Sequence, residues 1–167
     1  LVQPREENLD TYCIVGYTLA NTLSESGHVS RGICMTDEDG FLKSIVEHKK
    51  IFRRDNLIIS QIDDTKTVEF SGREIVSMNL MGFTPSLFDH LDAQFRTFIK
   101  DHIGNLSAEF YLPSVVNELV KEGNARVEVL HTPEKWFGVT YKEDRPMVIN
   151  SLIKLLEAGV YPVNLWE

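Results

Sequence analysis

Apolar and polar residues follow one another along this chain in a pattern that predicts strands in the first half and mostly helices in the second. Short apolar runs rich in β-branched and aromatic residues are separated by turn-forming residues, which is typical of a sheet with hairpins. We expect strands over residues 11–17, 29–36, 41–47, 50–54, 56–62, 67–70, 75–83 and 126–131, with a short aromatic strand or turn over 136–141. Asp39 and Gly40 lie between the second and third runs, and an Asp-Gly pair supplies the positive-φ residues of a tight hairpin turn.

A first helix is expected where apolar residues begin to recur at three- and four-residue intervals. Thr84 can cap this helix with its side-chain oxygen, and Pro85 suits the first helical position, where no N–H is needed. The apolar stripe of the helix consists of Leu87, Phe88, Leu91, Phe95, Phe98 and Ile99.

Two more helices are predicted in the second half, over residues 113–122 and from about Pro146 to Gly159. Gly123 follows the first of them, where glycine can adopt the left-handed conformation that ends many helices. The residues expected to face inward are Val115, Val116, Leu119 and Val120, and then Val148, Ile149, Leu152, Ile153 and Leu156. No repeat or linker interrupts the elements, so residues 1–167 are predicted to form a single α/β unit with a mixed sheet.

The composition is typical of a globular domain rather than of a disordered or membrane-spanning chain. Apolar residues make up 43% and charged residues 25% of the 167 residues. No apolar run approaches the roughly 18 residues of a membrane helix, and residues 1–10 lack the basic and apolar regions of a signal peptide. We therefore expect a cytoplasmic protein with no membrane partner.

The net charge of −8 argues against a nucleic-acid partner, because an acidic surface repels phosphate backbones. The exception is a basic cluster that can either meet one anionic group or remain solvated. This cluster consists of Lys49, Lys50, Arg53 and Arg54.

The motifs of common catalytic sites, such as GxSxG, HExxH and glycine-rich phosphate loops, do not occur in the sequence. The five histidines do not have the spacing of metal ligands, and no metal site is predicted. Cys13 and Cys34 lie in apolar stretches and form no CxxC pair, so we expect buried thiols rather than a disulfide or a zinc site.

Several residues with binding chemistry lie near the ends of predicted strands, where open α/β sheets usually hold their ligands. Gly32 allows a ligand to approach the backbone, the Glu47 carboxylate can accept sugar hydroxyls, and Lys49 offers a charge for a phosphate. Asn79 and Glu109 follow further along the chain. Each residue also has a structural interpretation, such as a bulge at Gly32 or a turn at Asn79, and only their combination favours a sugar-phosphate site.

The chain resembles the sugar-phosphate nucleotidyltransferases, also called nucleotide-sugar pyrophosphorylases, in three consecutive motifs: Arg31-Gly32-Ile33-Cys34, Asp39-Gly40 and Ile45-Val46-Glu47-His48-Lys49. Segments 77–85, 109–115 and 136–139 resemble later motifs of the family, so the resemblance extends from Cys13 to Trp166. It implies that Glu47 binds the sugar. His48 stands where the family has its phosphate-binding lysine, and we assign that role to the next residue, Lys49.

The resemblance implies a mixed-sheet, Rossmann-like nucleotidyltransferase fold, of which this chain is expected to be only the C-terminal, sugar-binding half. The glycine-rich nucleotide loop with which the family opens is not found in the sequence. The parent enzyme would join a nucleoside triphosphate to a sugar 1-phosphate, release pyrophosphate and use Mg²⁺. This chain would supply the sugar-phosphate pocket and have little or no turnover alone.

Gly138 stands where the family has a metal-binding aspartate, which makes Mg²⁺ binding by this chain questionable. This departure favours an alternative, in which the chain is a non-catalytic sugar- or nucleotide-sugar-binding protein on the same fold. A third interpretation is an interaction or scaffold domain. Exposed strand edges and apolar surface would also favour association with another chain or with a second copy.

Overall fold

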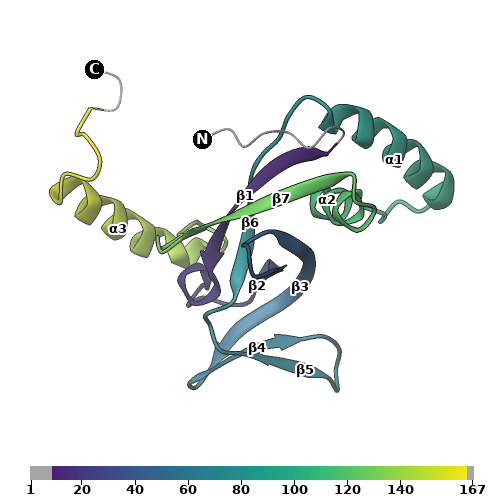
Figure 1. Ribbon diagram of the computed structural model, residues 1–167. Helices are drawn as coiled ribbons and strands as arrows, with labels where there is room; N and C mark the ends of the chain where they lie inside the picture. The colour runs from purple at the N-terminus through teal and green to yellow at the C-terminus, as the bar shows by residue number, and fades with distance from the viewer. Residues whose placement is uncertain (1–8, 165–167) are drawn as a thin grey trace.

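The computed structural model describes residues 9–164 and contains a curled, mixed seven-stranded sheet with three α-helices (Figure 1). The strand order is β5-β4-β3-β2-β6-β1-β7, and all neighbours are antiparallel except β1 and β7, which are parallel. Most of the polar N-terminal segment 1–10, and Trp166 at the end of the resemblance, lie outside the described residues.

The strands agree closely with the pattern of β-branched and aromatic residues in the sequence. They are β1 (Asp10–Thr18), β2 (Val29–Thr36), β3 (Leu42–Arg54), β4 (Leu57–Gln61), β5 (Thr67–Phe70), β6 (Ile75–Gly82) and β7 (Ala125–Thr132). The strands predicted over 41–47 and 50–54 are one strand, β3, with an irregularity in its pairing. Segment 136–141 forms no strand and runs beside the short 3₁₀ helix η1 (Leu19–Thr22), where the Trp136 N–H donates to the Asn21 carbonyl at 3.0 Å.

The sheet curls so far that the hairpin between β2 and β3 reaches the edge strand β7. Phe41 forms an isolated bridge with Glu128, and the Val129 N–H donates to the Gly40 carbonyl at 3.0 Å. These contacts pair part of the outer edge of β7, which would otherwise be open.

The hairpin turn uses one left-handed residue rather than the two that the Asp-Gly pair predicted. Gly40 has a φ of +86°, whereas Asp39 is not among the residues with positive φ. The Asp37 carboxylate accepts the N–H groups of Asp39 and Phe41 at 3.0 and 2.8 Å. This side-chain bonding holds a longer loop in place, so a two-residue turn is not needed.

Apolar side chains cover both faces of the sheet. On one face α2 (Leu112–Lys121) packs onto the sheet through Val115, Val116 and Leu119, which are buried as predicted. On the other face, η1 contributes Leu19 to a second cluster whose sheet residues are Val29, Ile33, Ile51, Ile58 and Val76. Gly123, with a φ of +71°, follows α2 as the sequence predicted.

α1 (Leu87–His102) begins later than the predicted cap at Thr84, and that prediction is wrong by about two residues. The Thr84 hydroxyl is bonded to the Ser86 hydroxyl at 2.7 Å, and Ser86 also donates to the Asp10 carboxylate at 2.7 Å. The Thr84 oxygen is therefore engaged within a turn and does not cap the helix. Only Leu87 of the apolar stripe is buried, while Phe88, Phe95 and Ile99 are exposed.

α3 (Arg145–Glu157), which follows the 3₁₀ helix η2 (Lys142–Asp144), projects from the sheet at the left of Figure 1 and buries none of its residues. The prediction that its apolar residues face a core is wrong: Val148 is half-buried, and Ile149, Leu152, Ile153 and Leu156 are exposed. A helical period identifies an apolar face but not what covers it. No helix between residues 9 and 164 is long and apolar enough to cross a membrane.

Both cysteines are free thiols. Cys34 is buried as predicted, whereas Cys13 is only half-buried. Burial raises the pKa of the Cys34 thiol to about 12, so this thiol remains protonated at neutral pH.

Candidate functional site

The candidate site lies where β2 and β6 separate. Their ladder ends at the pair Gly32 and Ser77. Beyond it the diverging strands enclose a hollow of about 110 Å³, which is lined by Ser30, Arg31, Gly32, Glu47, Ser77, Met78, Asn79 and Pro113. Backbone polar groups that leave a ladder need other partners, so such a hollow is suited to a polar ligand.

Gly32 lies in this hollow between Glu47 of β3 and Ser77 of β6. The register places Gly32 opposite Glu47 in one ladder and opposite Ser77 in the other. A Cβ added at Gly32 would lie 2.7 Å from Ile45 Cγ2 and 3.4 Å from Glu47 Oε2. Glycine at this position therefore keeps the hollow open.

Asn79 lies in a local bulge of β6 and not in a turn at the end of the strand. The β1–β6 register is broken between residues 14 and 16 of β1, which pair with residues 81 and 77 of β6. Three β6 residues, 78–80, therefore face a single residue of β1, and Asn79 is the middle one. It has a φ of +58° and donates its N–H to the Ser77 hydroxyl at 3.1 Å. Asparagine tolerates this left-handed conformation better than most residues, and backbone strain is often found at binding sites.

Glu47 is the acidic group of the hollow. Burial raises the pKa of its carboxyl group above the usual value, while the positive charges of Arg31 and Lys49 lower it in part. Its side chain still has enough exposed surface for a ligand to reach the oxygens. An ionised carboxylate here can accept several hydrogen bonds from neighbouring hydroxyl groups.

The lysine that follows is placed by a bulge in β3. Between the β2–β3 pairs Val29–Ile51 and Arg31–His48, a single β2 residue, Ser30, faces both Lys49 and Lys50. The Ser30 hydroxyl donates to the Lys49 carbonyl at 2.9 Å and stabilises the bulge.

His48 and Lys49 differ in their surroundings. His48 is half-buried, its Nδ1 lies 2.8 Å from the Ser60 hydroxyl, and its ring packs edge-on against Phe70. Burial lowers the pKa of the His48 imidazole, which favours its neutral form. Lys49 is exposed, and its positive charge lowers the pKa of the Glu47 carboxyl group, so it is an accessible basic residue near the hollow.

Arg31 is a residue of the hollow that sequence reasoning missed. It is only 8% exposed, and its guanidinium donates to the hydroxyl and the carbonyl of Thr22 and to the carbonyl of Ser30. It also lies over the Trp136 ring, 5.1 Å from the ring centroid. Arg31 lies on the same face of β2 as the buried Val29 and Ile33, two residues from each, and this spacing was the signal that could have shown it to be buried.

Glu109 does not line the hollow, and neither does Lys49, whereas the predicted site residues Gly32, Glu47 and Asn79 do. The Glu109 carboxylate accepts a hydrogen bond from the Tyr111 hydroxyl. Tyr111 in turn lines a second hollow of about 80 Å³, together with Ile45, Glu47, Pro113 and Ser114. Glu109 is therefore connected to the surroundings of Glu47 through its hydrogen bond with Tyr111.

The position of Gly138 does not fit the Mg²⁺ ligand that the resemblance implies. A Cβ added at Gly138 would lie 2.5 Å from the Trp136 ring, so a carboxylate there requires the ring to move. Residues 9–164 contain no group of three or more His, Cys, Asp and Glu side chains that could hold a metal ion.

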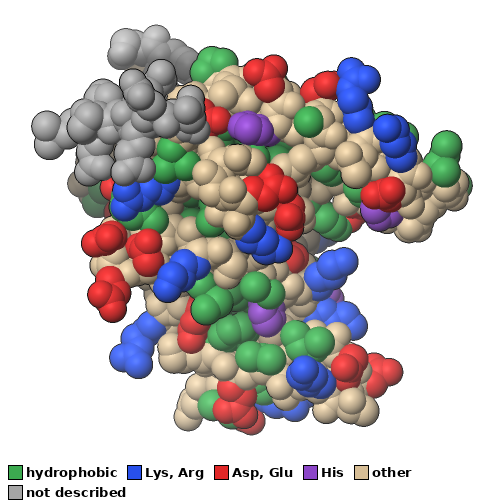
Figure 2. All heavy atoms as spheres, turned by 45° about the vertical axis from the view of Figure 1, so that its right-hand side comes forward, with side chains coloured by type: hydrophobic (Ala, Val, Ile, Leu, Met, Phe, Trp, Pro, Cys, Tyr) green, Lys and Arg blue, Asp and Glu red, His purple; other side chains and the backbone are tan. Residues whose placement is uncertain are grey.

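A wider groove lies elsewhere on the protein, between the loop after η1 and the β3–β4 hairpin. Its volume is about 410 Å³, and it is lined by Ser24, Glu25, Gly27, His28, Phe52, Arg53 and Asp55. Only Arg53 belongs to a group that the sequence analysis selected. On the face shown in Figure 2, basic and acidic side chains are interspersed and do not form separate regions.

No model of a known protein family matches this chain, and no curated protein does.

Proposed function

We propose that this chain forms the sugar-phosphate pocket of a nucleotidyltransferase, which joins a nucleoside triphosphate to a sugar 1-phosphate and releases pyrophosphate. The proposal rests on one observation: Glu47, Gly32 and Ser77 lie side by side on the neighbouring strands β3, β2 and β6, next to the bulge at Asn79. Four of the residues that sequence reasoning selected from separate segments, Gly32, Glu47, Lys49 and Asn79, lie at or beside one hollow.

The residues of the hollow supply binding and orientation in this proposal. The Glu47 carboxylate accepts sugar hydroxyls, and the missing side chain at Gly32 lets one edge of the sugar approach the backbone. The Asn79 side chain adds hydrogen bonds, and Lys49 attracts the phosphate. The sugar phosphate is thereby held so that one of its oxygens can attack the α-phosphorus of the nucleotide in line with the leaving pyrophosphate.

A second candidate is a non-catalytic sugar- or nucleotide-sugar-binding protein, and Gly138 specifically favours it. Glycine at this position supplies no carboxylate for a metal, whereas the residues of the hollow around Glu47 are present. Pyrophosphate release by the whole natural polypeptide, assayed with nucleoside triphosphate, glucose 1-phosphate and Mg²⁺, separates the two candidates. Release supports the transferase, and binding of the sugar phosphate without release supports the alternative.

Isothermal titration of glucose 1-phosphate into the wild-type chain tests the pocket itself. We expect Glu47→Gln to weaken binding about tenfold to a hundredfold, because hydrogen bonds to a charged acceptor are lost. Glu69→Gln is the matched control: Glu69 is an exposed residue of β5 outside the hollow, and binding should not change. Equal affinities of Glu47→Gln and wild type would contradict the proposed pocket.

A further inference from the structure

Arg31 is a buried cation, and no carboxylate between residues 9 and 164 forms a salt bridge with it. It borders the hollow, yet its three guanidinium hydrogen bonds end on neutral oxygens of Thr22 and Ser30. Buried arginines usually have an anionic partner, because removing the charge from water is costly. An anionic group of the ligand could therefore supply the partner that Arg31 lacks.

The surroundings of Arg31 offset the cost of burial only in part. The guanidinium lies over the Trp136 ring, which attracts a cation through its π electrons. Burial lowers the pKa of the guanidinium, while the negative charge of Glu47 raises it to a smaller extent. Glu47 lies on the neighbouring strand but forms no salt bridge with Arg31. Arginine stays protonated in proteins, so the hollow is bordered by a lasting positive charge.

The guanidinium is held in place and keeps free donors. A guanidinium has five N–H groups, and the bonds to Thr22 and Ser30 use one on Nε and one on each terminal nitrogen. Nη1 and Nη2 therefore retain one N–H each. Two N–H groups on the planar end of an arginine match the two oxygens of a carboxylate.

The charges around the hollow determine which anion suits Arg31. A carboxylate has one negative charge, which the single positive charge of Arg31 balances. A phosphate monoester has a charge of about −1.5 to −2 at pH 7, and Glu47 is already a negative group of the same hollow. Phosphate at Arg31 would thus bury excess negative charge, whereas the exposed Lys49 can neutralise it in contact with water.

We propose that the sugar phosphate bound by this site is a sugar acid, whose carboxylate pairs with Arg31. Glu47 accepts the hydroxyls of the sugar, and Lys49 attracts the phosphate. The substrate class is a hexuronic acid 1-phosphate. A neutral hydroxymethyl group in place of the carboxylate would leave the charge of Arg31 without a partner. The inference rests on the proposed function and adds a substrate class to it.

Isothermal titration of the wild-type chain with glucuronic acid 1-phosphate and glucose 1-phosphate tests the inference, because only the first carries a carboxylate. We expect the uronic acid to bind about tenfold more tightly or better, as hydrogen bonds between charged groups provide. Equal affinities, or tighter binding of glucose 1-phosphate, would overturn the inference while the proposed function stands. Failure of both ligands to bind would overturn the proposed function and the inference with it.

The salt dependence of this preference separates Arg31 from the exposed basic residues near the hollow. A buried ion pair is screened much less than an exposed one. The preference for the uronic acid should therefore persist at about 0.5 M NaCl. A preference that disappears there would assign the carboxylate to exposed lysines and overturn the pairing with Arg31.

The fluorescence of Trp136 reports on Arg31 without any change at Arg31 itself. The centroid of the Trp136 ring lies 5.1 Å from the guanidinium carbon, and in a Trp166→Phe background Trp136 is the only tryptophan. An anion that pairs with Arg31 weakens the field of the cation at the ring. Saturation with glucuronic acid 1-phosphate should shift the emission clearly, and glucose 1-phosphate much less. Equal shifts, or none, would overturn the inference.

A pair of arginine variants locates the effect. Arg31→Gln removes the charge and should abolish the preference for the uronic acid, while glucose 1-phosphate binds about as before. Arg73→Gln is the matched control, because Arg73 is exposed and borders neither hollow, and it should retain the preference. A preference that survives Arg31→Gln would overturn the inference. Equal weakening of both ligands by Arg31→Gln would assign the phosphate to Arg31 and overturn it as well.

Discussion

Gly32 and Glu47 face each other across β2 and β3, and only the missing side chain of Gly32 leaves space beside the carboxylate. A Cβ at Gly32 would meet Ile45 Cγ2 at 2.7 Å, which is closer than real Cβ contacts allow. Ile45 is buried and packs in the cluster that includes α2, so it has little room to move. The hollow and the packing of the core beneath it therefore depend on the same glycine.

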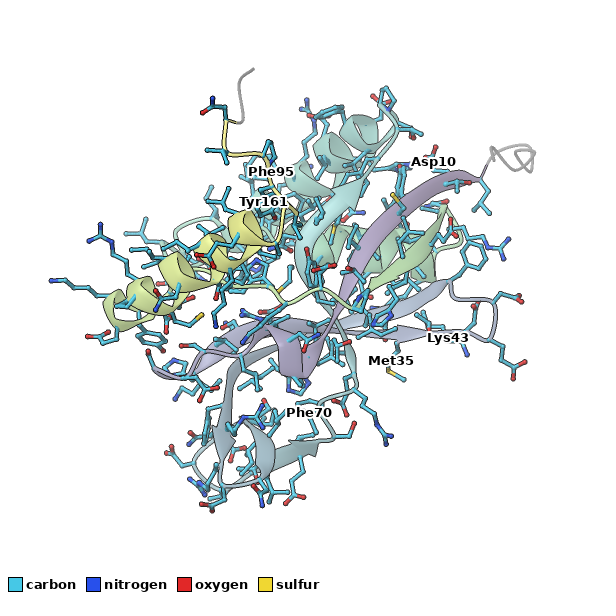
Figure 3. The ribbon with its side chains drawn as sticks, turned by 90° about the vertical axis from the view of Figure 1, so that its left-hand side faces the viewer. Asp10, Met35, Lys43, Phe70, Phe95 and Tyr161 are labelled. Atoms are coloured by element: carbon cyan, nitrogen blue, oxygen red, sulfur yellow. The ribbon has the colours of Figure 1, made fainter. Side chains whose placement is uncertain are left out.

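Gly32→Ala should lower the free energy of unfolding by about 1–3 kcal/mol, which is the usual cost of overpacking a core. It should also weaken binding of glucose 1-phosphate, because the new methyl group lies near Glu47. Urea unfolding measures the first effect and isothermal titration the second. Met35→Ala is the control on the same strand: Met35 is 58% exposed (Figure 3), and its loss should cost no more than about 0.5 kcal/mol. Equal stabilities of the two variants would contradict the tight contact at Gly32.

Protonation of Glu47 should weaken binding of glucose 1-phosphate. The pKa of its carboxyl group is raised, chiefly by burial, so binding should begin to weaken at a higher pH than the usual glutamate pKa would give. Titrations between pH 8 and pH 4 on the wild type and on Glu47→Gln measure this. The phosphate of the ligand titrates equally in both proteins, so the difference between the two profiles reports Glu47 alone. Parallel profiles would show that the Glu47 charge does not take part.

The stability effect of Glu47→Gln should have the opposite sign to its binding effect. Because the pKa of Glu47 is raised in the folded protein, the ionised carboxylate is less favourable there than in the unfolded chain. The stability that the protonated form contributes is present at low pH and is lost as the pH rises through the raised pKa. Glu47→Gln should therefore have the same Tm as wild type, or one higher by up to about 4 °C, at pH 7. A clearly lower Tm would mean that Glu47 stabilises the fold and is not kept for binding.

The ionised carboxylate of Asp10, in contrast to that of Glu47, should stabilise the folded protein. Partial burial raises the pKa of this carboxyl group, but hydrogen bonds from Ser86, His90 and Tyr12 outweigh burial and hold the pKa below its usual value. The carboxylate links the start of β1 to α1, through Ser86 at 2.7 Å and His90 at 3.0 Å (Figure 3 labels Asp10). Its contribution to stability is present above the pKa of an unfolded aspartate and is lost as the pH falls through the lowered one.

Asp10→Asn should lower the stability at pH 6 by about 1–2 kcal/mol, the usual value of hydrogen bonds to a charged group at a partly exposed site. The difference from wild type should shrink as the pH falls below about 4. Thermal unfolding at pH 6, 4 and 3 measures both quantities. A difference that is the same at all three pH values would contradict the role of the ionised carboxylate.

α2 and α3 should respond very differently to the loss of a leucine side chain. Leu119 of α2 is 1% exposed and lies in the core, whereas Leu152 of α3 is 40% exposed. Leu119→Ala should cost about 2–5 kcal/mol, and Leu152→Ala about 0.5 kcal/mol or less. Urea unfolding of both variants tests the assignment, and similar costs would show that the apolar face of α3 is covered in solution.

The strands were predictable because their signals are local. Val29–Thr36 is rich in apolar and β-branched residues and ends before the turn residues that begin at Asp37, and β2 has the same bounds as the prediction. The burial of α3 was not predictable, because Ile149 and Leu152 have the spacing of a core-facing helix whether or not another element packs on them. The start of α1 depends on a contact between Ser86 and Asp10, 76 residues apart in the sequence, which no local pattern contains.

The candidate site shows the same division. Gly32 and Glu47 could be selected by residue type, and the pairing of two neighbouring strands then brings them together. Asn79 was selected as a binding residue, with a turn as its structural alternative; its φ is positive, but it belongs to a bulge, which depends on the register with β1. Arg31 was missed because a single arginine is usually solvated, and its burial depends on Thr22 and Trp136 in other segments.

The central claim is that a sugar phosphate binds where β2 and β6 separate, and amide chemical shifts in two-dimensional NMR spectra test it most directly. On titration with glucose 1-phosphate, we expect the largest shifts at the backbone N–H groups of Gly32, Ser77 and Asn79, with saturation in the wild type and much smaller shifts in Glu47→Gln. Shifts confined to the wider groove near His28 and Arg53, or no shifts at millimolar ligand, would contradict the claim.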